Sequence, residues 1–145
     1  VVDDIKSIVR PQLGEEVPLL LFRILRIIGM RSILGETSGA TLYMMGKKVG
    51  NMLPVRTVEE FSETIRNLKI GIPEVAIVDE DHVTVKLFEC ITCAGFTYTG
   101  EMFCDMESGI IAGLLENVYG KKARSTQTKS WSAGFNYCEF EVFFY

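Results

Sequence analysis

The chain has 145 residues, of which 48 % are hydrophobic and 23 % charged, and this suits one domain with one core. Its net charge of −4 argues against nucleic acid as a partner of this domain, because phosphate contacts need a basic surface. The most apolar run, residues 17–30, contains Arg23 and Arg26 and is shorter than the about 20 residues that cross a bilayer, so we expect no membrane span.

Residue 1 is Val rather than Met, so a segment before it, including a targeting segment, is left open. Four cysteines in 145 residues are too few for a disulfide scaffold, and nothing else in the sequence suggests secretion. We therefore expect a reducing, cytoplasmic environment in which the thiols are free or bound to a metal.

The first half of the chain is predicted to be helical. A short helical extension over 1–13 ends at Pro11 and Gly14, and a helical part follows over 14–72. A helix beginning near Pro18 is apolar on both flanks, so we expect it to be buried on more than one side.

Two further helices are expected after the loop at 35–39. One covers 38–52, with an apolar stripe of Leu42, Met45, Val49 and Leu53. The next begins at Thr57, which forms a capping box with Glu60, and it is predicted to end at Gly71.

The second half, residues 73–145, is predicted to be a sheet with one inserted helix. Residues 74–90 alternate apolar and polar side chains around an acidic turn, which indicates two strands. A helix over 101–120 closes at Gly120, and two strands follow at 121–130 and 136–145. Helices followed by β-β-α-β-β predict an α+β fold with an antiparallel sheet.

The cysteines are the first candidate site. Cys90 and Cys93 have the two-residue spacing of a zinc-ligand pair, whereas Cys104 and Cys138 do not form a second such pair. Cys104 falls in the first turns of a helix, where the helix dipole favours a thiolate. A zinc site, four inert buried thiols and a redox role all stay open, since cysteine is also a common core residue.

A second candidate is an apolar ligand pocket near the inserted helix. Gly109 and Gly113 lie on one helix face, where they indicate either close packing or room for a ligand or a dimer partner. Glu107 beside them is a candidate ligand contact or a capping residue. Phe103 and Trp131 belong to a large apolar set that suits either an adaptable pocket or a core.

Motifs of known catalytic chemistry are absent from the sequence. We find no nucleophile elbow, phosphate-binding loop, zinc-protease motif or dinucleotide fingerprint, and one histidine leaves few general bases. We therefore expect binding rather than catalysis.

The C-terminal half resembles the 4-vinyl reductase domain family, including archaeal stand-alone members described as hydrocarbon-binding. The likeness extends over residues 18–144, of which about 55 residues are distinctive. Its matching pieces are the Cys93–Gly95 turn, Cys104 with Glu107 and Gly109, the run AGLLE, Gly120, Trp131, Gly134 and Cys138–Phe140.

This resemblance implies a fold like that of TRAPP vesicle-tethering subunits, shared with ligand-binding domains of nitric-oxide signalling and Golgi transport. It also implies a homodimer that binds a hydrophobic small molecule. In related sensor domains three cysteines and a glutamate hold zinc; Cys104 and Cys138 match two of them, but Gln127 and Ser130 stand at the other two positions. Cys93 and Cys90 complete a site only if their strand end reaches Cys104.

Three hypotheses follow. The first is a dimeric small-molecule binding or sensor domain with a pocket between helices and sheet and at most one zinc ion. The second is an assembly or scaffold subunit with a filled core. The third is a reductase of a vinyl group on a tetrapyrrole or isoprenoid-like substrate, although no flavin or nicotinamide motif is present.

Overall fold

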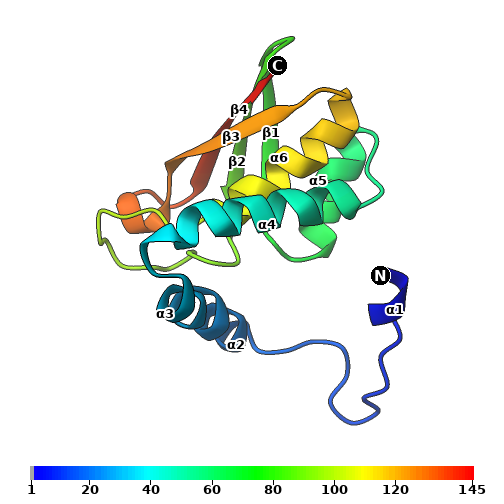
Figure 1. Cartoon of the computed structure of the whole chain (residues 1–145), viewed down its shortest axis with the longest axis vertical. Coiled ribbons are helices and arrows are strands. Elements are labelled where there is room, and N and C mark those ends of the chain that lie inside the picture. The colour runs from blue at the N-terminus through cyan, green and yellow to red at the C-terminus, as the bar shows by residue number, and fades with distance from the viewer. Residues whose placement is uncertain (1) are drawn as a thin grey trace.

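The computed structural model describes residues 2–145, so the predicted extension over 1–13 begins at a residue outside the described part. Four antiparallel strands form one sheet in the order β1-β2-β4-β3 (Figure 1). They are β1 (Ile72–Asp79), β2 (His82–Phe88), β3 (Ala123–Lys129) and β4 (Cys138–Phe144). The predicted α+β fold is confirmed.

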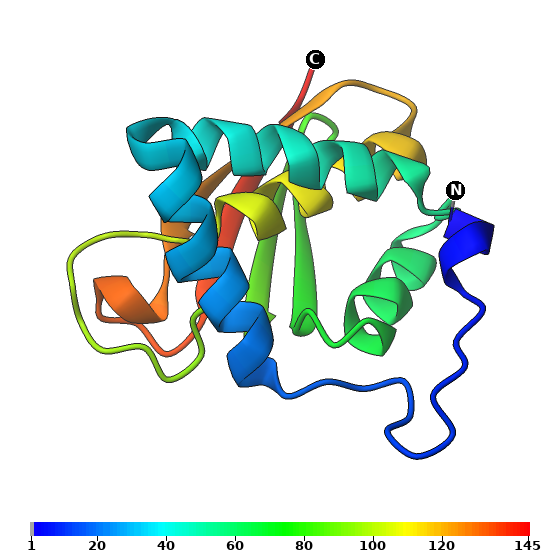
Figure 2. The ribbon, with the colours of Figure 1, turned by 60° about the horizontal axis from the view of Figure 1, so that its bottom comes forward.

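One face of the sheet carries the core. Val83, Val85 and Leu87 of β2 are fully buried and alternate with half-buried residues, as predicted. Helix α6 (Asp105–Tyr119) packs against this face and ends, as predicted, at Gly120 in the left-handed conformation. The sheet and α6 thus enclose the core, and α4 (Ser38–Met52) crosses α6 on its outer side (Figure 2).

Helix α5 (Val58–Asn67) confirms the predicted cap. The side chain of Thr57 accepts a hydrogen bond from the backbone N–H of Glu60 at 3.1 Å. The helix ends four residues before Gly71, however, because Lys69 adopts a left-handed φ of 58° that breaks the helical path.

The prediction for helix 38–52 is right in its bounds and wrong in its apolar stripe. Met45 and Val49 are exposed, whereas Gly46 and Gly50 are buried together with Leu42. The glycines form the packing face because an added Cβ at Gly46 would lie 3.0 Å from the Ile110 nitrogen, with the Met106 carbonyl oxygen closer still. Close approach of two backbones thus replaces side-chain packing here.

The N-terminal part begins with α1 (Val2–Ile5) and an exposed segment that extends to Pro18. Next come α2 (Leu19–Arg23), a π-helical turn η1 (Ile24–Gly29) and α3 (Met30–Leu34), here called the helical arm (residues 19–34). A 3₁₀ turn η2 (Gly35–Thr37) joins the helical arm to α4, and another, η3 (Trp131–Ala133), precedes β4.

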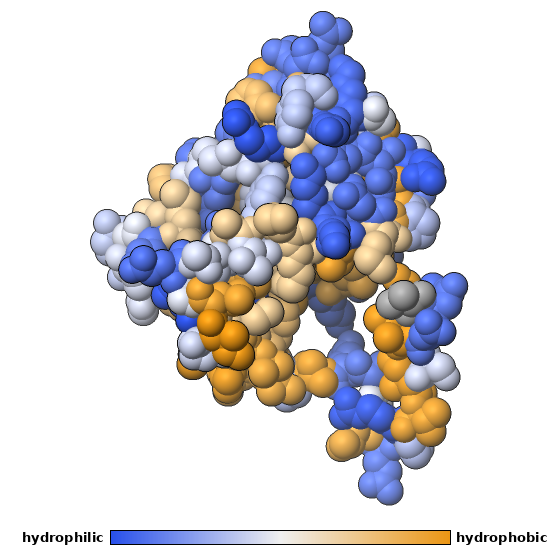
Figure 3. All heavy atoms as spheres, in the orientation of Figure 1, coloured by the Kyte–Doolittle hydropathy of each residue, from blue (hydrophilic) through white to orange (hydrophobic). Residues whose placement is uncertain are grey.

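The expectation that the helix near Pro18 is buried on more than one side is wrong. Leu20 is 67 % exposed and Ile28 is 66 % exposed, because the helical arm touches the rest of the protein along one side only. Figure 3 shows hydrophobic residues gathered on the surface over α2 and α3. Within residues 2–145, every helix is too short or too polar to cross a bilayer.

Candidate metal centre and apolar groove

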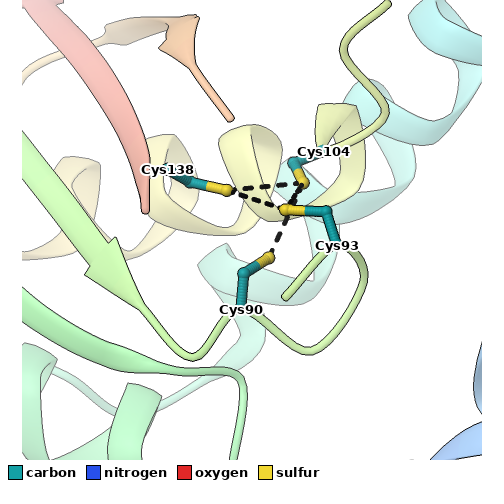
Figure 4. A group of neighbouring side chains, drawn as sticks. All are labelled: Cys90, Cys93, Cys104 and Cys138. Atoms are coloured by element: carbon teal, nitrogen blue, oxygen red, sulfur yellow. Dashed lines mark hydrogen bonds between the residues drawn. The ribbon is translucent and has the colours of Figure 1, made fainter. Parts of the chain in front are cut away.

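The four cysteines meet at one buried point (Figure 4). The Cys93 sulfur lies 3.0 Å from that of Cys138 and 3.3 Å from that of Cys104. Cys104 is also 3.6 Å from Cys90 and 3.8 Å from Cys138, sulfur to sulfur. All four are free thiols and fully or almost fully buried, so the condition set by the sequence, that the end of β2 reach Cys104, is met.

Strand pairing explains this meeting. Leu87 near the end of β2 pairs with Cys138 at the start of antiparallel β4, so the chain leaves β2 beside Cys138. Glu89 then turns the chain with a left-handed φ of 54°, and Cys90 and Cys93 follow in a tight turn. The cysteine loop (residues 89–104) ends at Cys104, the N-cap of α6.

The donor set and spacing fit a four-coordinate metal ion. With zinc–sulfur bonds of about 2.3 Å, tetrahedral sulfurs lie about 3.8 Å apart, close to the separations of the four thiols. Four buried sulfurs gathered in this way are typical of a closed structural site. Gln127 does not join them; its side-chain oxygen accepts a hydrogen bond from the Cys104 backbone N–H at 3.2 Å.

Electrostatics also favour a cation among the thiols. Hydrogen bonds from Cys104, Cys138 and Cys90 lower the pKa of Cys93, so one thiolate forms readily there. The neighbouring sulfurs and burial raise the pKa of Cys104, so further thiolates are disfavoured in the protein alone. A divalent ion would offset this mutual repulsion.

A buried polar group supports the cysteine loop from α6. The carboxylate of Glu107, which is fully buried, accepts a short hydrogen bond from Thr92, the residue between Ile91 and Cys93. Its other oxygen has no partner in the described part of the chain. Burial raises the pKa of Glu107 to about 7, and the charge of Cys90 adds to this effect.

The residues predicted to contact a ligand are dispersed. Gly109 and Gly113 lie in the α4–α6 crossing, where an added Cβ would meet the α4 backbone, so the close-packing alternative describes them. Phe103 is buried against Phe96, with ring centroids 5.3 Å apart. Trp131 packs on the core, and its backbone N–H bonds to the Cys93 sulfur.

An apolar groove of about 400 Å³ lies on the other side of the cysteine loop's anchor points, between the helical arm, α4 and α6. It is lined by Phe22, Leu25, Arg26, Gly29, Met30, Ile33, Met45 and Met106. Sequence reasoning missed this site because its walls come from the faces that were predicted to be buried. The apolar patch in Figure 3 marks this side of the protein.

A second hollow of about 450 Å³ lies between the helices and β3, closer to the predicted place for a pocket. Asp105, Ser108 and Arg124 are among its lining residues. An apolar molecule gains less there, because polar groups would lose water without a matching partner. The apolar groove is therefore the better candidate for a hydrophobic ligand.

Fold and site together define a helix-covered antiparallel sheet with a cysteine cluster at the end of its central strands. Residues 83–143 match the vinyl-4-reductase domain, the same 4-vinyl reductase domain that the sequence resembles. The uncharacterised protein MJ1642 of Methanocaldococcus jannaschii is 32 % identical over 131 residues, which cover 90 % of this chain and 80 % of that protein. The chain belongs to the vinyl-4-reductase domain family.

Solved structures share the fold. A vinyl-4-reductase family protein from Methanocaldococcus jannaschii has a TM-score of 0.74 at 23 % identity, covering 92 % of this chain and 85 % of its own. The phenol-responsive sensory domain of the transcription activator PoxR, solved with phenol, has 0.72 at 15 % (90 % and 76 %). A trafficking protein particle complex subunit 3 from Naegleria fowleri, covalently bound to palmitic acid, has 0.65 at 16 % (88 % and 95 %).

Proposed function

We propose that this chain is a small-molecule binding domain of the sensor type, which takes a hydrophobic molecule in the apolar groove. The groove carries this proposal: seven of its eight lining residues are apolar or glycine, and its about 400 Å³ lies within the size range of small-molecule sites. Support comes from the fold, since the PoxR domain was solved with phenol and the trafficking subunit with palmitic acid.

Binding of an uncharged fluorescent probe, N-phenyl-1-naphthylamine, tests the groove. Leu25→Gln puts a polar group on its wall and should weaken probe binding by about tenfold, the equivalent of ~1.4 kcal/mol of lost apolar burial. Leu20→Gln is the matched control, because Leu20 lies exposed on the same helical arm but outside the groove lining. Equal probe affinity in both variants and the parent protein contradicts the proposal.

We further propose that Cys90, Cys93, Cys104 and Cys138 hold one structural zinc ion. The support is a set of four buried sulfurs at tetrahedral spacing. Elemental analysis of protein purified without chelator should give one zinc per chain, and Cys104→Ser should lose it. Gln127→Ala should keep the metal; loss of zinc there would instead assign a ligand role to Gln127, and zinc-free parent protein would remove the site.

The helical arm and α4 leave Leu20, Ile28 and Met44 exposed, which supports a homodimer through this surface. Sedimentation equilibrium tests it: Ile28→Glu should shift the protein to monomer, while Leu13→Glu, on the exposed N-terminal segment, should not. A monomeric parent protein contradicts the dimer. Four free buried thiols support a reducing, cytoplasmic location.

A further inference from the structure

The charged side chains of the helical arm all reach the cysteine loop. The arm contains three arginines and no acidic residue. Arg23 donates from Nε to the Ile91 carbonyl at 2.9 Å, and from Nη2 to the carbonyls of Ala94 at 3.0 Å and Cys90 at 3.4 Å. One guanidinium therefore spans the turn that presents Cys90 and Cys93.

The other two arginines bind the far end of the same loop. Arg26, which is only 6 % exposed, donates from Nη2 to the Phe103 carbonyl, one residue before Cys104. Arg31 forms an ion pair with Glu101 at 3.1 Å and lies over the Phe103 ring at 4.4 Å. The helical arm is thus tied to both ends of the segment that carries three of the four cysteines.

Apolar packing contributes little to the position of the arm. Leu20, Leu25 and Ile28 are each at least 60 % exposed, so the arginine contacts are the arm's main attachments to the loop. Figure 2 shows the arm leaving the N-terminal end of α4 and passing beside the cysteine loop. Arg26 sits in the π-helical turn Ile24–Gly29, a local irregularity of a kind that often occurs at functional sites.

We propose that a metal ion at the four cysteines sets the position of the helical arm, and through it the shape of the apolar groove. A guanidinium holds several carbonyls only while their relative positions are fixed, because its donors form a rigid planar fork. Sulfur ligation fixes the turn at 90–93 relative to Cys104, and so fixes the carbonyls that Arg23 and Arg26 bind.

The groove inherits this dependence, since Phe22, Leu25, Arg26, Met30 and Ile33 of the arm make most of its lining. The consequence for a ligand rests on the proposed function: metal loading raises the affinity for an apolar molecule. By linkage, an apolar ligand raises the affinity for the metal by the same factor. The proposed regulation of the groove is therefore by the metal state of the cysteine cluster.

Hydrogen–deuterium exchange of the whole chain, zinc-loaded and chelator-treated, tests the position of the arm without any ligand. Zinc should slow amide exchange in residues 19–34 by about fivefold or more, the lower end of ordinary coupling between sites. Exchange in α5 should change much less, because α5 packs against β1 and α6. N-phenyl-1-naphthylamine affinity should rise with zinc by a similar factor.

Arg23→Lys separates coupling from general stabilisation, because lysine keeps the charge and loses the fork that spans three carbonyls. This variant should keep one zinc per chain and lose most of the zinc effect on arm exchange. Arg66→Lys, on the exposed face of α5, should keep the full effect.

Two results overturn the proposal: arm exchange that is the same with and without bound zinc, or a zinc effect spread equally over α5, which is global stabilisation only. Arm exchange that responds to zinc while no probe binds in either state contradicts the proposed function of the groove and leaves the metal–arm coupling supported. The two failures are therefore distinguishable.

Discussion

Replacing Gly109 by Ala tests the α4–α6 crossing on which the fold of the site depends. An added Cβ would lie 2.8 Å from the Lys47 backbone nitrogen, about 0.7 Å inside an ordinary contact near ~3.5 Å, and closer still to the Tyr43 carbonyl oxygen. Both obstacles are helix backbone, so α4 as a whole must move. Overpacking of this kind costs about 1–3 kcal/mol, and the gain in helix propensity offsets only about 1 kcal/mol.

Because the contacts are with rigid backbone, we expect the upper part of that range and a net loss of about 2 kcal/mol. Urea denaturation followed by circular dichroism measures it, and the melting temperature should fall by roughly 4–8 °C. Gly29→Ala is the matched control: Gly29 has helical dihedrals and its nearest obstacle is 3.8 Å away, so this variant should be neutral or slightly stabilised. A Gly109→Ala protein as stable as Gly29→Ala refutes the reasoning.

Three further predictions concern the cap, the buried acid and the metal. Thr57→Ala removes the cap of α5 and should lower the free energy of unfolding by about 1 kcal/mol, measured in urea, whereas Thr41→Ala on the exposed face of α4 should change it little. Glu107 has a pKa of about 7 in the folded protein, above its unfolded value, so the folded state holds the extra proton between about pH 4.5 and 7 and stability should fall as pH rises through that window, by up to ~3 kcal/mol; Glu107→Gln should flatten this slope, and an unchanged slope would assign it to other groups. Chelation of zinc should lower the melting temperature of the parent protein and leave that of Cys104→Ser unchanged; a parent protein indifferent to chelator contradicts a structural metal.

The sequence predicted the elements of the second half well, because their signals are local. Alternation in β2, the cap at Thr57 and the left-handed Gly120 each depend on a few neighbouring residues. The end of α5 was missed because Lys69, a residue without a turn signature, takes the left-handed conformation that was expected near Gly71.

The cysteine cluster could be predicted only in part. The pair Cys90 and Cys93 is visible as a spacing, whereas Cys104 and Cys138 join it through strand pairing, which spacing does not encode. A usable signal did exist: one cysteine pair follows β2, one cysteine opens the inserted helix, and one opens the last strand. In an antiparallel β2–β4 pair these positions share one end of the sheet.

Helix packing was the weakest part of the prediction, because hydrophobicity was taken as burial. The α4 glycines Gly46 and Gly50 have the same four-residue spacing as Gly109 and Gly113, and these matching pairs mark the crossing. The groove-lining Met45 and the arm residue Leu25 are apolar yet exposed. An apolar pattern is the same whether its residues face a core, a ligand or a second copy of the chain.

The helical arm places its cations inward and much of its apolar surface outward, which is costly for an isolated helix. Burying Arg26 removes a charge from water, and only well-placed acceptors compensate for this. Those acceptors are backbone carbonyls of a loop whose geometry depends on four sulfurs that repel one another once ionised. The stability of the arm is therefore tied to whatever neutralises the cysteine cluster, while the exposed apolar face gains by contact with a ligand or a second subunit. A helix built in this way can respond both to the metal and to a ligand, which is what the proposed sensor requires.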